Sequence, residues 1–529
     1  MLLHISSLPS CYGVGDFGEG AFAFLDFLDR AGIAAWQVLP LAPTVAANAY
    51  SPYSSPSAFA GNPLFVAPDR LAQLGLLDEA ALRRCALVPA DAADYAAAEA
   101  IKGDLLRDAY DRFRDDGADM RAFRRISDAF LDFCGEEAHW LEDYALFSVL
   151  KRMEDGAPWW EWRPAWRDRD WSALDPLKAR PDVARALDFQ RFVQFLFHLQ
   201  LRELREACER RGIELIGDMP IYVADDSADV WGYRRFFELG ETGRPTSVAG
   251  VPPDYFSEEG QHWGNPLYRW DEMRQDGYGW WMRRIRHVLR GVHRLRIDHF
   301  RGLVEYWAIP AGEETAVRGA WREGPGGDFL RVLEENFYPG GACPPFIAED
   351  LGVASDSVTD AMERFRLPGM KVLQFAFGEG MPDNPYIPHR HRRNCVVYAG
   401  THDNNTIAGW WDEDATPLER DNFLAYAGLS CADAADAADA MLRMAIFSTA
   451  DLAVFAAQDI LRLGGEARTN TPSTVDGNWL WRLSGLEALN RRAEEVRRLI
   501  HLGGRLPRLE HGYRVEAGRF DLDLAAPGG

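Results

Sequence analysis

Eight short apolar runs, separated by segments with helical spacing, constrain the fold of this chain more than any other feature. Runs of this length and composition are typical of strands buried in a parallel sheet. Eight such strand and helix units predict a (β/α)8 barrel, the TIM barrel of the α/β class, in which reactive side chains lie on the loops that follow the strands. In chain order the runs are MLLHISSLPS from residue 1, then 34–39, IELIGDMP (213–220), VHRLRID (292–298), PFIAED (345–350), MKVLQFAF (370–377), CVVYAG (395–400) and LAVFAAQD (452–459).

The alternation of strands and helices is interrupted by two long insertions. Residues 67–185 are rich in Ala and charged side chains and contain no evident strand, so we expect a largely helical insertion subdomain after the second strand. Residues 1–66 then begin the barrel, and residues 186–500 supply the remainder with an inserted loop, rich in Pro, Gly and aromatic residues, at 221–270. Residues 501–529 have weak periodicity, which predicts a C-terminal extension.

Composition limits the classes of partner. The chain has 529 residues, of which 47% are hydrophobic, and this suffices for a large core in one barrel with insertions or in several domains. The net charge of −23 disfavours nucleic acid, because binding to its backbone needs clustered Lys and Arg. A neutral substrate is more compatible with this net charge than a nucleic acid is.

The N-terminus and the cysteines indicate the cellular compartment. MLLHISSLPS lacks a basic segment followed by a long apolar stretch, and nowhere do about 18 uncharged apolar residues run together. The seven cysteines are an odd set with wide gaps, so neither a disulfide framework nor a CxxC metal site is indicated. We therefore expect a cytoplasmic protein with no membrane partner.

Three acidic residues stand at the ends of three apolar runs: Asp298, Glu349 and Asp403. Carboxylates delivered from separate strands to one mouth suit glycosidic bond chemistry, in which one attacks the anomeric carbon, one protonates the leaving oxygen and a third steadies the oxocarbenium-like transition state. Arg296 lies two residues before Asp298, on the same side of a strand, and supplies a cation that keeps Asp298 ionised. No GxxxxGK[ST] motif indicates a phosphate site.

Six sequence pieces occur together in order: SPYSSPSAFAGNP, GDMPIYVADDSADVW, GVPPDYFSEEGQHWGNPLY, LRIDHFRG, IAEDLG and AGTHDNNT. Together they resemble the amylomaltases, the bacterial and plant 4-α-glucanotransferases, which are relatives of the α-amylases. The resemblance spans roughly residues 1–500. It implies an enzyme that cuts an α-1,4 bond in a maltodextrin and passes the glycosyl unit to the 4-hydroxyl of another glucan or of glucose, without cofactor or metal.

The resemblance also assigns roles within a retaining double displacement. Asp298 looks like the nucleophile that forms a covalent glucosyl enzyme, Glu349 like the general acid that then serves as base, and Asp403 like the stabiliser that holds sugar hydroxyls. This division agrees with the chemistry, because a nucleophile stays ionised while an acid keeps its proton.

Further residues are expected to bind substrate because they lie in the family's motifs or on loops after strands. Asp254, Tyr255 and Phe256 resemble a mobile loop that covers the donor chain, and Tyr53 resembles part of an aromatic glucan groove. Asp218 looks like a sugar-binding carboxylate or one that simply ends its strand. The full set is Tyr53, Asp218, Asp254, Tyr255, Phe256, Trp263, Arg296, His402 and Asn470.

The chain departs from the family pattern in two places. Relatives carry an Asn, Pro and Gly run after the eighth strand, whereas this chain has RTNTPST with Ser473 in the glycine position, where a positive φ strains the backbone. The segment PTVAANAYSPY lacks the usual glycines before SPY. We therefore expect a differently shaped entrance loop, and acceptor preference does not follow from the sequence.

Three other functions are weighed against transfer. A metal-dependent barrel hydrolase has candidate ligands but no HxH or HExxH spacing. A noncatalytic glucan-binding protein would lack one of the three carboxylates, and all three are present. Hydrolysis of α-glucans stays open at this stage, because water and a sugar hydroxyl attack the same intermediate. The candidate metal ligands are His4, Asp218, His299, Glu349, His402 and Asp403.

Overall fold

The computed structural model describes residues 1–115, 121–253, 257–352 and 355–506. A parallel sheet contains, in spatial order, β1 (Ala35–Gln37), β2 (Glu214–Pro220), β5 (Arg294–Asp298) and β8 (Phe346–Ala348). A second parallel sheet contains β11 (Leu452–Val454), β10 (Cys395–Tyr398) and β9 (Gly369–Val372).

Backbone hydrogen bonds join the two sheets into a ring. Leu2 pairs in parallel with Gln37 on one side and Ala456 on the other, so the N-terminal segment lies between β1 and β11. On the far side the Ala348 N–H donates to the Pro368 carbonyl at 2.9 Å, which links β8 to the segment before β9. The ring therefore has eight strand segments, and they are the eight predicted runs. The prediction of a (β/α)8 barrel is confirmed.

The barrel interior is largely apolar, with buried polar side chains at Gln37 of β1, Asp218 of β2 and Arg296 of β5. In this strand Leu295 and Ile297 join a core cluster with Ile285 of the covering helix, while Arg296 is buried on the other side of the strand, with its Nε 3.4 Å from the Met370 sulfur. The other strands fill the interior with Leu2, Ala35, Ile216, Ile347, Met370, Val372, Val396, Tyr398 and Val454.

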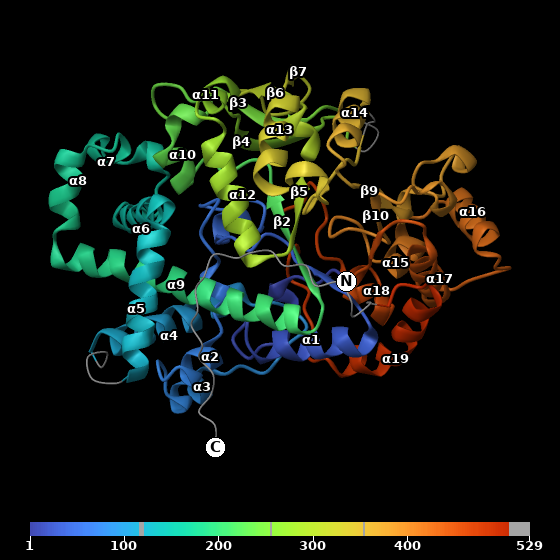
Figure 1. Cartoon of the computed structure of the whole chain (residues 1–529), viewed down its shortest axis with the longest axis horizontal. Coiled ribbons are helices and arrows are strands. Elements are labelled where there is room, and N and C mark those ends of the chain that lie inside the picture. The colour runs from blue at the N-terminus through green and yellow to red at the C-terminus, as the bar shows by residue number, and fades with distance from the viewer. Residues whose placement is uncertain (116–120, 254–256, 353–354, 507–529) are drawn as a thin grey trace.

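Helices surround the strands (Figure 1). The long α9 packs against β2, α12 against β5 and α17 against β11, and α1 packs between α9 and α19. Their bounds are α1 (Glu19–Ala31), α9 (Pro181–Arg210), α10 (Ala228–Gly232), α11 (Trp270–Gln275), α12 (Gly279–Gly291), α13 (Gly326–Phe337), α14 (Asp356–Arg364), α15 (Ile407–Gly409), α16 (Pro417–Ala427), α17 (Ala434–Phe447), α18 (Ala457–Leu461) and α19 (Glu487–Leu502).

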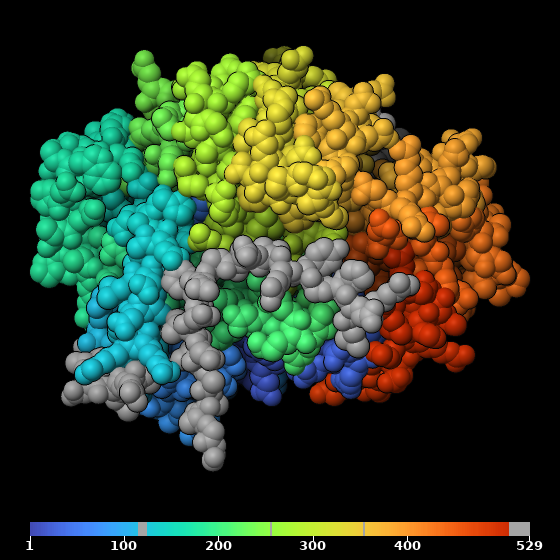
Figure 2. Space-filling view, viewed as in Figure 1, coloured from blue at the N-terminus to red at the C-terminus, as the bar shows by residue number. Residues whose placement is uncertain are grey.

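The described part of the region from residue 67 to 185 consists of helices joined by turns and loops, as its composition predicts. In the space-filling view its cyan and teal residues lie on one side of the molecule, and the orange and red residues of the last barrel units lie on the other (Figure 2). That this region folds as a subdomain of its own stays a prediction. Its helices are α2 (Pro68–Gln73), α3 (Glu79–Cys85), α4 (Tyr95–Asp115), α5 (Arg121–Glu136), α6 (Ala138–Met153), α7 (Pro164–Arg167) and α8 (Trp171–Lys178).

An antiparallel sheet was not anticipated from the sequence. Its strands, in spatial order, are β4 (Gln261–Pro266), β3 (Ser247–Val251), β6 (Glu305–Pro310) and β7 (Ala320–Glu323). The segment 221–270, expected to be a loop, thus contains two strands. QHWGNP shows no apolar alternation, and it becomes a strand by pairing with β3, which in turn pairs with the distant β6.

No helix within the described ranges has the length and apolar character needed to span a membrane.

Candidate active site

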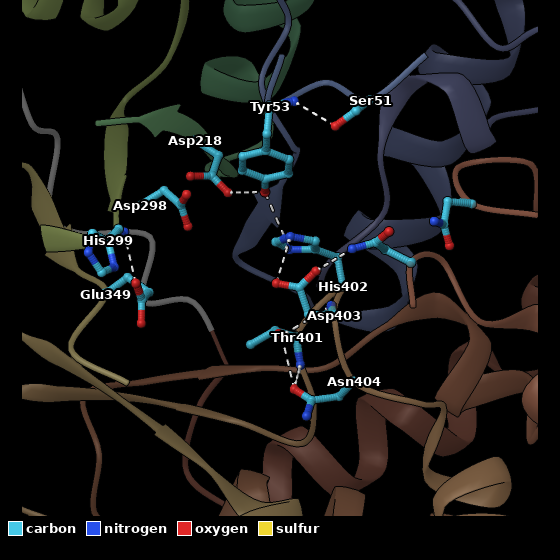
Figure 3. Close-up of polar contacts among 12 residues, drawn as sticks. Ser51, Tyr53, Asp218, Asp298, His299, Glu349, Thr401, His402, Asp403 and Asn404 are labelled. Carbon is cyan, nitrogen blue, oxygen red and sulfur yellow. Dashed lines mark hydrogen bonds and ion pairs between the residues drawn. The ribbon is translucent and has the colours of Figure 1, made fainter. Parts of the chain in front are cut away.

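Four carboxylates meet at the C-terminal ends of the barrel strands. Asp218 lies in β2, and Asp298 is the last residue of β5. Glu349 directly follows β8, and Asp403 lies in the loop after β10. Because the parallel strands all end on the same side of the barrel, these side chains converge on one mouth (Figure 3).

Arg296 joins two of these carboxylates. Its Nη1 lies 2.8 Å from both oxygens of Asp218 and 2.9 Å from Oδ1 of Asp298. Arg296 and Asp218 are almost fully buried, whereas 28% of the Asp298 side chain is exposed. Burial acts to lower the pKa of Arg296, but the two carboxylates raise it well above its ordinary value. The guanidinium therefore stays charged, and it lies against Asp298 as the two-residue spacing predicts.

Glu349 is held by two backbone donors. The His299 N–H donates to its Oε2 at 2.8 Å, and the Leu351 N–H donates to its Oε1 at 2.7 Å. Burial raises the pKa of Glu349 to about 7, with Arg296 opposing the shift and Asp298 adding to it. Glu349 therefore keeps its proton to a much higher pH than an ordinary glutamic acid does, and the protonated form is the one that a general acid needs.

Asp403 is oriented by the loop after β11. The Asn470 side-chain amide donates to its Oδ1 at 2.6 Å, and His402 Nε2 lies 3.3 Å from its Oδ2. Arg468 donates from Nη2 to the Asp403 carbonyl at 2.6 Å and from Nε to the Asn470 carbonyl at 2.8 Å. The Asp403 carboxylate is 45% exposed, so it faces the open mouth in a fixed direction.

Tyr53 connects the two sides of the mouth. Its hydroxyl donates to Asp218 Oδ2 at 2.8 Å and lies 3.4 Å from His402 Nδ1. Its ring stacks on His402 with the ring centroids 4.9 Å apart and the planes 13° from parallel. The predicted Tyr53, Asp218 and His402 thus form one contact network (Figure 3).

Trp263 lies beside the catalytic candidates. Its ring meets His299 edge to face at a centroid distance of 4.8 Å, and 37% of the residue is exposed. His299 directly follows Asp298, so Trp263 borders the mouth as predicted. Asp254, Tyr255 and Phe256 lie outside the described residues.

A sequence profile described as 4-alpha-glucanotransferase matches residues 3–488 of the chain. The chain belongs to the 4-alpha-glucanotransferase family. It is 45% identical over 490 residues to the 4-alpha-glucanotransferase of Thermus thermophilus, covering 91% of this chain and 94% of the relative. It is 38% identical over 516 residues to the chloroplastic and amyloplastic 4-alpha-glucanotransferase of Solanum tuberosum, covering 96% and 86%.

Solved structures agree with this assignment. The amylomaltase from Streptococcus agalactiae, solved in complex with acarbose, has a TM-score of 0.88 and 33% identity, with 96% of this chain and 99% of that chain covered. The amylomaltase from Corynebacterium glutamicum, at 18% identity and a TM-score of 0.71, shares the fold, with 95% and 74% covered. The protein is thus an enzyme that transfers glucan segments, and no relative supports the hydrolase alternative. The resemblance inferred from the six motifs is confirmed.

Two residues of this 4-alpha-glucanotransferase site were missed. Arg468 lies two residues before Asn470, the spacing that drew attention to Arg296, yet no apolar run marks its segment as part of the mouth. His299 was considered only as a metal ligand. It stands in the left-handed region at φ 50°, which costs a non-glycine residue about 1–2 kcal/mol, and its N–H contacts Glu349.

The metal alternative gains no support from the geometry. Within the described residues no three His, Cys, Asp or Glu side chains are grouped so that they could hold a metal ion. His4 is engaged instead by the Leu39 N–H, which donates to its Nδ1 at 3.2 Å. Burial lowers the pKa of His4 to about 3.

Ser473 shows the backbone conformation expected at the family's glycine position. Its φ is 63°, in the left-handed region. The serine holds this conformation at a cost of about 1–2 kcal/mol.

Proposed function

We propose that this transferase acts on α-1,4-linked maltooligosaccharides by a retaining double displacement, with Asp298 as nucleophile, Glu349 as acid and base, and Asp403 as stabiliser. The observation that carries the proposal is the contrast between two neighbouring carboxylates. Asp298 pairs with Arg296 at 2.9 Å, whereas burial raises the pKa of Glu349 to about 7. A carboxylate paired with a buried cation suits nucleophilic attack, and a carboxyl group with a raised pKa suits proton donation.

In the first step an Asp298 carboxylate oxygen attacks the anomeric carbon of the donor. Glu349 gives its proton to the glycosidic oxygen, the bond to that oxygen breaks, and the reducing-end fragment leaves as an alcohol. The other fragment stays on Asp298 as a covalent ester. Asp403, oriented by Asn470 at 2.6 Å, accepts hydrogen bonds from ring hydroxyls as positive charge develops on the sugar.

In the second step the 4-hydroxyl of another glucan, or of glucose, attacks the same carbon. Glu349, now ionised, takes the hydroxyl proton, and the Asp298 carboxylate leaves. Two inversions restore the α configuration. The 4-alpha-glucanotransferase names of the relatives support this substrate class.

Aromatic cover around the mouth favours a sugar over water as acceptor. Trp263 and Tyr53 border the carboxylates, and such rings both exclude water and stack on apolar sugar faces. The predicted donor-covering residues Asp254, Tyr255 and Phe256 belong to the same proposal. A cytoplasmic location and the absence of a nucleic-acid partner stay predictions.

Maltotriose as sole substrate tests transfer. We expect glucose together with maltotetraose, maltopentaose and longer chains, while the total of reducing ends stays nearly constant because each bond broken is replaced. Chromatography of the products and a reducing-sugar assay measure both quantities. One new reducing end per bond cleaved would show a hydrolase and would contradict the proposed acceptor, although the roles of Asp298 and Glu349 would stand.

The pH dependence of the first step tests the acid. Glu349 must carry its proton when the donor binds. We therefore expect kcat/KM for maltodextrin to be independent of pH below the Glu349 pKa of about 7, and to fall about tenfold per pH unit above that pKa. Initial rates at low substrate between pH 5 and 9 measure this. A profile that stays flat to pH 9 would contradict the assignment of Glu349.

A further inference from the structure

One face of the antiparallel sheet presents a cluster of aromatic and acidic side chains outside the barrel mouth. Trp307 of β6 and Trp321 of β7 are directly opposite each other, with ring centroids 5.3 Å apart. Two residues along, Glu305 is directly opposite Glu323. These four residues are called the outer platform. The other face of β6, which includes Tyr306, packs into the core.

The outer platform is continuous with the catalytic segment. Arg301 lies in the 3-10 helix Phe300–Leu303, three residues after Asp298. Its guanidinium carbon lies 4.1 Å from the centre of the Trp321 ring, and its Nη2 pairs with Glu305 at 2.6 Å. The chain therefore leads from the proposed nucleophile directly to the platform. In Figure 1 the strands of this sheet lie beyond the barrel strands β2 and β5.

Folding alone gives no reason for this arrangement. Trp321 is 42% exposed, so one face of its ring is open to a ligand. Like charges directly opposite each other across two strands are destabilising, and the Glu323 side chain makes no hydrogen bond or ion pair with any described residue. An exposed ring beside unpaired carboxylate oxygens is the combination that binds a sugar, with its apolar face on the ring and its hydroxyls on the oxygens.

We propose that the outer platform binds the α-1,4-glucan chain beyond the sugar units held at the catalytic carboxylates. This inference rests on the proposed function, because it takes the ligand to be the same glucan. Trp321 supplies the stacking plane and Glu323 accepts hydrogen bonds from hydroxyls. Long chains reach the platform, whereas a short substrate such as maltotriose occupies the mouth alone.

A glucan fits the platform better than a protein partner does. Stable protein interfaces bury more than about 1,000 Å² with a contiguous apolar centre, whereas this patch has one exposed ring bordered by two carboxylates. The short chain distance between Asp298 and Arg301, which contacts Trp321, also favours a ligand that already occupies the mouth.

The test compares Trp321→Ala with a matched control, Trp171→Ala. Trp171 begins α8 on the helical region, is 44% exposed and also lies against cations, with Arg169 at 5.2 Å and Lys178 at 5.5 Å. We expect Trp321→Ala to raise KM about tenfold for amylose or maltodextrin of many units and to leave maltotriose kinetics unchanged. Trp171→Ala is expected to change neither the KM for long glucans nor the kinetics with maltotriose. Trp321→Phe, which keeps a ring, should recover part of the affinity.

Each other outcome counts against the platform. Equal losses on maltotriose and on long chains would indicate a structural role for Trp321, and unchanged KM on long chains would exclude binding there. A lower solution mass of Trp321→Ala than of the wild type, without a change in KM, would indicate a protein contact instead. Failure of the proposed function is distinguishable, because the wild-type enzyme would then form no longer chains from maltotriose.

Discussion

Asp298→Ala is expected to lower the turnover of maltodextrins by at least about 10⁴-fold, the scale on which loss of a covalent nucleophile acts. Binding is expected to survive, because Tyr53, Trp263 and Asp403 are untouched. The fold is expected to persist as well, since Arg296 keeps both 2.8 Å contacts with Asp218 after Asp298 loses its carboxylate. Product chromatography measures turnover, and titration calorimetry with maltoheptaose measures binding.

The control for this variant is Asp271→Ala. Asp271 lies in the first turn of α11, its side chain is 89% exposed, and its single 3.5 Å contact with Arg274 is a surface pair of small energetic value. Asp271→Ala is expected to turn over maltodextrins at the wild-type rate. A residual rate of Asp298→Ala above about one hundredth of wild type would contradict the nucleophile assignment.

The parts of the site that the sequence predicts are those fixed by local rules. A buried apolar run that ends in an acid specifies a strand and the side of the barrel on which its last side chain lies. Asp298 and Glu349 were identified in this way, and Arg296 followed from its two-residue spacing, which the 2.9 Å contact with Asp298 confirms. The roles themselves came from the family resemblance rather than from spacing.

The parts that the sequence does not predict depend on pairing between distant segments. β3 forms hydrogen bonds with β6, which begins more than fifty residues later along the chain, and QHWGNP of β4 has the composition of a loop. Arg468 acts through carbonyl oxygens of Asp403 and Asn470, which no side-chain pattern records. The hydrogen bond from the His299 N–H to Glu349 is likewise not predictable, because its donor is a backbone group that no side-chain pattern records.

The Arg296 cation contacts two carboxylates of the mouth that differ in exposure. Arg296 is buried between Asp218 and Asp298, so the fully buried Asp218 offsets its charge while the partly exposed Asp298 is left to react. Asp298 in turn helps keep the proton on Glu349, whose raised pKa arises first from burial. When Asp298 becomes an ester its negative charge is lost, and Glu349 ionises more readily. The acid of the first step is thereby prepared to act as the base of the second.

Glu349→Gln tests this exchange of roles. The variant keeps the volume of the side chain and an oxygen that can accept from the Leu351 or His299 N–H, but it has no proton to donate. We expect the first step on maltodextrin to slow by about 10³-fold, within the usual range for loss of a general acid. An activated donor, α-glucosyl fluoride, needs little protonation to lose fluoride, so its first turnover is expected to stay within about tenfold of wild type.

The measurement is the release of fluoride in the first turnover, set against single-turnover cleavage of maltodextrin. Asp350→Asn is the matched control, because Asp350 is the adjacent carboxylate and its Oδ1 accepts from the Met370 N–H at 2.7 Å, a bond that an asparagine oxygen keeps. That variant is expected to slow maltodextrin cleavage far less than Glu349→Gln does, because Asp350 contributes least to the raised pKa of Glu349 and is not proposed to protonate the glycosidic oxygen. An equal loss on both donors for Glu349→Gln would mean that this residue is not the acid. We expect a selective loss on maltodextrin, because the pKa of about 7 assigns the proton to Glu349. With α-glucosyl fluoride we expect the glucosyl ester to accumulate, because no base activates the acceptor.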